Sequence, residues 1–192
     1  MRRRLTAIAL AAATLVAGAT VGTTTSPASA GAEDTVRITV KVDGCPTCQL
    51  GLVQYDEADP DSYWSVPYRQ VRHGKVVFEI PADRTRGTSI SIDAPWATAY
   101  IHGTQFVVMQ YGGFEPGDRV TRRQALNADE GGRCWSGSDR DRTLHVTVAR
   151  KRYGTAPEVG LRAWANPTLP STDMGTVFEG SIVTTHPHCP PA

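Results

Sequence analysis

The sequence predicts an all-β fold, an antiparallel β-sandwich, from two observations. First, residues 35–42 alternate strictly, with valine or isoleucine at positions 36, 38, 40 and 42 and polar residues between them. That period of two indicates a strand with one buried and one solvated face. Second, similar short segments recur between glycine, proline and aspartate turns, while almost no stretch has a helical period. We expect a sandwich of the immunoglobulin-like or prealbumin-like type.

The other strands follow in order from the same alternation. Ile90 and Ile92 repeat it, and so do three apolar residues of segment 143–149. A turn at 72–75 (Arg-His-Gly-Lys) joins two candidates, and Gly74 can adopt the positive φ that a tight hairpin requires. The strands expected after the first are residues 49–55, 64–71, 75–80, 88–93, 105–111 and 143–149.

One short helix is expected between the sheets. Thr121 can cap its start and Gln124 can reach back to complete a capping box. Val120 and Ala125 stand where a hydrophobic staple would form. The helix should run to about Ala128, before two glycines end it.

The chain divides into three parts on composition. Residues 1–30 combine three arginines at positions 2–4, an apolar stretch at 5–16 and a small-residue Ala-Ser-Ala site at 28–30, which is typical of a signal peptide. The apolar stretch is too short to span a bilayer. Residues 31–150 form the sandwich domain. Residues 151–192 hold six of the 13 prolines, so we expect a Pro-rich C-terminal extension that packs on the same domain, with strands at 159–164 and 176–184.

Export predicts a secreted, extracellular protein and sets the interpretation of charge. After residue 30 the chain keeps 17 of its 20 lysines and arginines, since three lie in the signal, against 19 aspartates and glutamates. Both nucleic-acid binding and membrane-surface binding depend on clustered basic charge. We therefore expect no nucleic acid partner and no membrane insertion.

The four cysteines are expected to form two disulfides, because the compartment is oxidising and their number is even. Four cysteines allow three pairings, and the sequence leaves them open. We favour Cys45 with Cys48, which closes a very short loop. Cys134 with Cys189 would then close a loop of about 55 residues, worth on the order of 4 kcal/mol in the chain-entropy model.

Several short motifs follow one another along residues 35–149. They are Cys45-Pro-Thr-Cys48 after an alternating strand, Arg84-Thr-Arg-Gly87, Asp93-Ala-Pro-Trp96, Val120-Thr and Cys134-Trp135-Ser-Gly137. The set resembles uncharacterised secreted proteins of Gram-positive bacteria. The resemblance implies a small exported β domain with no established activity, and it supplies no catalytic residues.

The sequence favours a non-catalytic extracellular binding module for a glycan or a protein. No nucleophile motif such as G-x-S-x-G is present, so no catalytic residue and no cofactor are expected. Tyr63, Trp64 and Tyr68 cluster after an acidic segment and could form a flat platform for sugar rings.

Two alternatives remain open for the function. Cys45 and Cys48 have the C-x-x-C spacing of thiol-redox enzymes, although the helix that would activate the first thiol is not expected after them. His186 and His188 place two imidazoles on one extended segment, as copper and zinc sites do. The first alternative is a redox protein, and the second is a metal-binding protein.

Overall fold

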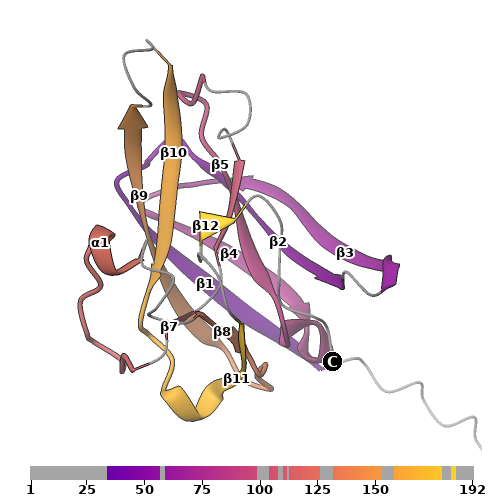
Figure 1. The fold of residues 1–192 in the computed structure, drawn as a ribbon. Helices are drawn as coiled ribbons and strands as arrows, with labels where there is room; N and C mark the ends of the chain where they lie inside the picture. The colour runs from indigo at the N-terminus through magenta and orange to yellow at the C-terminus, as the bar shows by residue number, and fades with distance from the viewer. Residues whose placement is uncertain are drawn as a thin grey trace, which may run out of the picture. The chain divides into compact units, whose positions relative to one another are not determined.

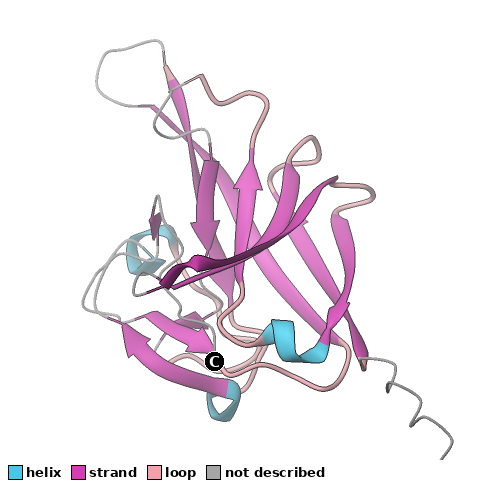
Figure 2. Ribbon diagram, turned by 90° about the vertical axis from the view of Figure 1, so that its right-hand side faces the viewer, coloured by secondary structure: helices cyan, strands magenta, loops and turns pink. Residues whose placement is uncertain are grey.

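The computed structural model describes residues 34–56, 59–98, 104–107, 110–111, 113–125, 132–152, 158–178 and 183–184. Residues Glu33–Ala192 cluster into one compact unit. Within the ranges given above, strands predominate and the helices are short turns (Figures 1 and 2). The expected signal peptide lies outside the described residues, as do His186, His188 and Cys189.

Sheet A has four strands in the order β10-β9-β1-β4 (Figure 1). β1 (Thr35–Asp43) pairs antiparallel with β4 (Lys75–Pro81) and parallel with β9 (Arg142–Arg152). β10 (Val159–Asn166) lies antiparallel to β9. The parallel pair departs from a wholly antiparallel sandwich. It is possible because the chain passes through a second sheet between β1 and β9, and such a long connection lets β9 return in the direction of β1.

Sheet B has five strands in the order β12-β6-β5-β2-β3, and every pairing in it is antiparallel. Its members in chain order are β2 (Gln49–Asp56), β3 (Asp59–Gln70), β5 (Ser89–Asp93), β6 (Thr104–Val107) and β12 (Val183–Thr184).

A smaller sheet C consists of β7 (Gln110–Tyr111), β8 (Gly132–Trp135) and β11 (Met174–Phe178). Its middle strand, β8, carries alternating residues into two different clusters. Trp135 enters the main core, whereas Cys134 joins a smaller cluster with Trp164.

The main core is built from the inward faces of sheets A and B. Ile38, Phe78 and Val146 come from sheet A and are completely buried, and Leu50 and Ile90 meet them from sheet B. Period-two alternation places these residues on one face of each strand. The predicted all-β sandwich is therefore confirmed.

Short helical turns connect the strands: η1 (Ala82–Thr85), α1 (Arg122–Ala125) and η4 (Ser171–Asp173). At α1 the Gln124 backbone N–H donates to the Thr121 hydroxyl at 3.3 Å, and the Thr121 N–H donates to Gln124 Oε1 at 3.0 Å. This reciprocal pair is the predicted capping box. Residues 126–131, where the helix was expected to end, lie outside the described part of the chain.

Two of the predicted strands each divide between two sheets. Segment 105–111 contains β6 of sheet B and β7 of sheet C, and segment 176–184 contains parts of β11 in sheet C and β12 in sheet B. A local pattern indicates extended backbone, but it does not indicate which strand will pair with it. From the Pro-rich C-terminal part, β10 is hydrogen-bonded to β9 as a member of sheet A.

One of the predicted disulfides is present. Cys45 and Cys48 are joined, and both are buried in the main core, with exposed fractions of 1% and 0%. Cys134 is also disulfide-bonded, whereas Cys189, the partner expected for it, lies outside the described residues. Within the described ranges, no helix is both long and apolar enough to cross a membrane.

Candidate functional site

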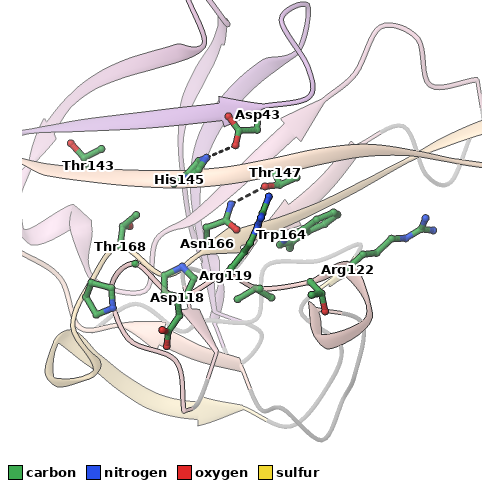
Figure 3. Close-up of a pocket in the computed structure, with 15 residues that line it drawn as sticks. Asp43, Asp118, Arg119, Arg122, Thr143, His145, Thr147, Trp164, Asn166 and Thr168 are labelled. Atoms are coloured by element: carbon green, nitrogen blue, oxygen red, sulfur yellow. Dashed lines mark hydrogen bonds and ion pairs between the residues drawn. The ribbon is translucent and has the colours of Figure 1, made fainter.

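The outer face of sheet A carries an open groove of about 950 Å³. Its floor comes from the end of β1 and from β9 and β10, and its opposite wall comes from the segment that leads into α1 (Figure 3). The residues that line it are Asp43, Pro116, Gly117, Asp118, Arg119, Val120, Thr121, Arg122, Thr143, His145, Thr147, Trp164, Asn166, Pro167 and Thr168.

Alternation along β9 explains the polar floor of the groove. Leu144 and Val146 point into the main core, so Thr143, His145 and Thr147 must point outward. The floor therefore presents hydroxyls and an imidazole in one row.

An acid–imidazole pair stands at one side of the groove. The Nε2 of His145 lies 2.8 Å from the Oδ2 of Asp43 (Figure 3). In the parallel register Lys41 is opposite His145 and Asp43 is opposite Thr147, so the carboxylate reaches diagonally across the two strands. The side chains are 30% and 65% exposed. The pair is thus oriented by its own bond while remaining accessible from solvent.

A second hydrogen bond fixes the next two polar side chains. The Nδ2 of Asn166 donates to the hydroxyl of Thr147 at 2.8 Å (Figure 3). Asn166 lies opposite His145 in the antiparallel register, and Thr147 lies opposite Trp164. The side-chain oxygen of Asn166, Oδ1, and the hydroxyl proton of Thr147 are not used in this bond. Both are therefore able to bond to a ligand.

The opposite wall rests on a small apolar cluster. Trp164 and Val120 are 7% and 4% exposed, and they pack with Ala125 and Cys134 on the outer face of sheet A. The wall is also tied to the segment after β10, because the Gly117 N–H donates to the Pro167 carbonyl at 3.2 Å. These contacts fix the position of the wall relative to sheet A.

The α1 side of the groove carries charged side chains of both signs. Arg119 and Arg122 line it together with Asp118. Burial lowers the pKa of Lys151, and the charges of Arg162 and Arg122 lower it further. A ligand in this groove would therefore meet Asp43 near one side, and guanidinium groups together with the Asp118 carboxylate near the other.

Two of the three residues expected to form an aromatic platform, Tyr63 and Tyr68, lie close together on one face. Tyr63 and Tyr68 are exposed by 58% and 45%, and both line a shallow depression of about 120 Å³ on the outer face of sheet B. The Tyr68 ring lies over Gly51, and its hydroxyl is hydrogen-bonded to Ser91.

Trp64 does not share this face. It packs partly buried against the main core, with the Arg84 guanidinium 5.9 Å from its ring centroid. Neighbouring strand residues project to opposite faces, so Tyr63 and Trp64 separate. A register shift opposite Leu50 and Leu52 places one extra residue in β3. That bulge brings Tyr68 round to the face of Tyr63.

The C-x-x-C motif lies in the core and outside the groove. The Trp96 indole N–H donates to the Cys45 sulfur at 3.2 Å and helps to cover it. Thiol exchange requires access for an attacking thiolate, so this burial favours a structural disulfide over the redox alternative.

The metal alternative falls on His186 and His188, which lie outside the described residues. Among the residues that are described, no group of three or more histidine, cysteine, aspartate or glutamate side chains could hold a metal ion.

Sequence reasoning missed the groove. The signal in the sequence that could have indicated the groove is the series of polar residues at positions 143, 145 and 147, which alternation places on an outer face. Asp43 and Asn166 come from distant segments, and only the strand pairing brings them to His145.

Comparisons with protein-family models, with curated proteins and with solved structures find no match for this chain.

Proposed function

We propose that the protein is a secreted, non-catalytic binding module that holds a glycan in the groove of sheet A. The observation that carries the proposal is the row of polar side chains oriented by mutual hydrogen bonds, Asp43 with His145 and Thr147 with Asn166, in an open groove. Side chains that are already oriented lose little entropy on binding.

The chemistry of the groove suits a ligand rich in hydroxyl groups. A sugar hydroxyl both donates and accepts hydrogen bonds. The Asp43 carboxylate and the Asn166 carbonyl can accept, while threonine hydroxyls and the Arg119 guanidinium can donate. A protein ligand would be expected to bury large apolar anchors. Among the described residues the exposed large hydrophobics are Tyr63 and Tyr68, which lie on the other sheet.

A binding role is supported over catalysis by the bonds of His145. Nucleophilic catalysis requires a hydroxyl or thiol within hydrogen-bond reach of a base. In the described part of the chain the polar partner of His145 is Asp43, with no serine, threonine or cysteine bonded to it. The expected signal peptide and the disulfides support an extracellular location.

The test is calorimetric titration of the mature chain with a panel of soluble neutral and acidic oligosaccharides. The double variant His145→Ala/Asn166→Ala should bind at least about tenfold more weakly, which corresponds to about 1.4 kcal/mol. The matched control Tyr63→Ala/Tyr68→Ala removes the aromatic pair of the other sheet and should bind as the parent does. Circular dichroism checks that both variants are folded.

Two results would overturn the proposal. If the tyrosine variant loses binding and the groove variant keeps it, the glycan site lies on sheet B. If no oligosaccharide of the panel binds the parent, the glycan is the wrong class of ligand.

A further inference from the structure

The connection between β3 and β4 gathers basic side chains at one edge of the sandwich. A second groove, of about 470 Å³, lies there. Arg69, Arg72, His73 and Lys75 line it, and all four residues are exposed. Arginine and lysine in one concave site attract oxyanions, because the walls of the groove concentrate their field.

The positive charge continues onto the outer face of sheet A. Lys41 of β1 is directly opposite Lys75 of β4, and like charges in that position disfavour folding. Asp43, two residues further along β1, is bonded to His145. Among the described residues, no ion pair involves Lys41, Arg72 or Lys75. The cations are therefore left to a partner from outside the chain.

The hairpin that carries the cations is fixed in shape. Arg72 and Lys75 exchange both backbone hydrogen bonds, at 3.0 and 3.1 Å, and the Val42 N–H donates to the Gly74 carbonyl at 2.8 Å. His73 has a φ of 50° and Gly74 a φ of 71°. Two consecutive positive φ values define the turn type in which asparagine and glycine are preferred. His73 instead projects an imidazole from this turn at some strain.

Arg69 is oriented within the same groove. Its Nη1 donates to the Val77 carbonyl at 2.6 Å, and its guanidinium carbon lies 5.4 Å from the Phe78 ring centroid. A guanidinium held in this way keeps further N–H groups for a carboxylate, sulfate or phosphate oxygen.

The basic edge and the sheet A groove belong to one surface. In the strand register Lys75 lies opposite Lys41, Lys41 lies opposite His145, and His145 lies opposite Asn166. Directly paired residues project to the same face, so this row runs across all four strands of sheet A. A chain-like ligand in the groove could follow the row onto the hairpin.

We propose that the hairpin edge, with Arg69, Arg72, His73, Lys75 and Lys41, binds the oxyanion groups of an acidic polysaccharide whose sugar hydroxyls occupy the sheet A groove. The polymer class rests on the proposed function, whereas the anion site rests on the hairpin. After its signal the chain has more acidic than basic residues, which does not suit the charge density of nucleic acid.

The experiment compares ligands that differ in charge alone. Polygalacturonate oligomers and their methyl esters share one backbone, and dextran sulfate with dextran provides the same contrast for sulfate. At about 50 mM salt we expect the acid form to bind at least about tenfold more tightly than the ester, with an advantage that falls as salt rises. The polygalacturonate pair measures a preference for carboxylate, and the dextran pair measures a preference for sulfate.

The decisive variant is Arg72→Gln/Lys75→Gln, which should remove the advantage of the acid form and leave ester binding unchanged. The matched control is Arg86→Gln/Arg140→Gln, two exposed cations away from the hairpin. It makes the same change in net charge and should keep the advantage. Equal binding of acid and ester to the parent, or an advantage that survives the hairpin variant, would overturn the inference.

The two proposals fail in different ways. If ester and acid bind equally and the groove variant weakens both, the groove stands and the anion site falls. If only the acid forms bind, and only the hairpin variant weakens them, the anion site stands and the groove falls.

Discussion

Asp43 and His145, 102 positions apart, are joined by a 2.8 Å contact between neighbouring parallel strands. The bond depends on register, because Asp43 is paired with Thr147 and reaches back along β9 to the imidazole. The parallel pairing of β1 and β9 thus creates the side of the groove where a carboxylate is held in place.

Replacing Asp43 with asparagine should impair binding more than folding. Both side chains of the pair are partly exposed, and exposed ion pairs contribute at most about 1 kcal/mol. We expect the free energy of unfolding in urea to change by less than about 1 kcal/mol. Glycan affinity in the calorimetric assay should fall several-fold, because one carboxylate oxygen is replaced by an N–H donor and the negative charge is lost.

The control for this prediction is Asp139→Asn, which alters an exposed aspartate that pairs with Arg140 away from the groove. It should leave affinity unchanged. Equal losses of affinity in the two variants would show that Asp43 has no specific part in binding.

Gly44, directly after Asp43, should be intolerant of a side chain. It has a φ of +81°, and a Cβ there would lie 2.2 Å from the Val148 carbonyl oxygen. Left-handed backbone costs about 1–2 kcal/mol for other residues, and the contact with Val148 adds to this. Gly44→Ala should therefore lower the free energy of unfolding by more than about 3 kcal/mol, measured by urea denaturation.

Gly113 is a matched control, because it has the same φ of +81° and no atom of the described residues lies within 4 Å of its Cβ position. Gly113→Ala should show only the backbone strain. If both variants lose the same stability, close packing against Val148 is not what requires glycine at position 44.

Strand positions could be predicted because they follow from local alternation. The segments around Ile38, Phe78 and Val146 each place apolar residues at every second position, and each became a core strand. The capping box at Thr121 is equally local. The parallel pairing of β1 with β9 could not be predicted, since it depends on where the chain goes between them.

The candidate site illustrates the same limit. Alternation places Thr143, His145 and Thr147 on an outer face, but it does not indicate that Asp43 and Asn166 flank them. Proximity in sequence grouped Tyr63, Trp64 and Tyr68 as one platform, whereas a bulge in β3 decides which of these aromatic residues share a face. Long-range register and bulges have no local signature of this kind.

Gln54 should be a stabilising polar residue of the core. It is 2% exposed, and its Nε2 donates to the carbonyls of Arg84 and Arg86 at 2.9 and 2.6 Å, linking β2 to η1. Gln54→Met keeps the length of the side chain and removes Gln54 Oε1, which is buried without a hydrogen-bond partner among the described residues. It leaves the Arg86 carbonyl without its Nε2 donor, and this loss should dominate. We expect a loss of about 1–3 kcal/mol in the free energy of unfolding.

Gln70 provides the exposed counterpart, since its Nε2 donates to the Thr47 carbonyl at 3.0 Å on the surface. Gln70→Met should change stability by less than about 0.5 kcal/mol, because water can replace the lost donor. Similar losses in the two variants would show that burial of the Gln54 amide is not what matters.

The disulfides should differ in strength because they close loops of different length. In the chain-entropy model the loop from Cys45 to Cys48 contributes about 2 kcal/mol, and the predicted loop from Cys134 to Cys189 about 4 kcal/mol. Cys45→Ala/Cys48→Ala should therefore be destabilised less than Cys134→Ala/Cys189→Ala in urea denaturation.

Mild reductant should leave the Cys45–Cys48 bond intact in the folded protein, because both sulfurs are buried, and should cleave it in denaturant. A non-reduced peptide map and intact mass measure both effects. Rapid reduction of Cys45–Cys48 in the folded state would contradict the structural role and restore the redox alternative.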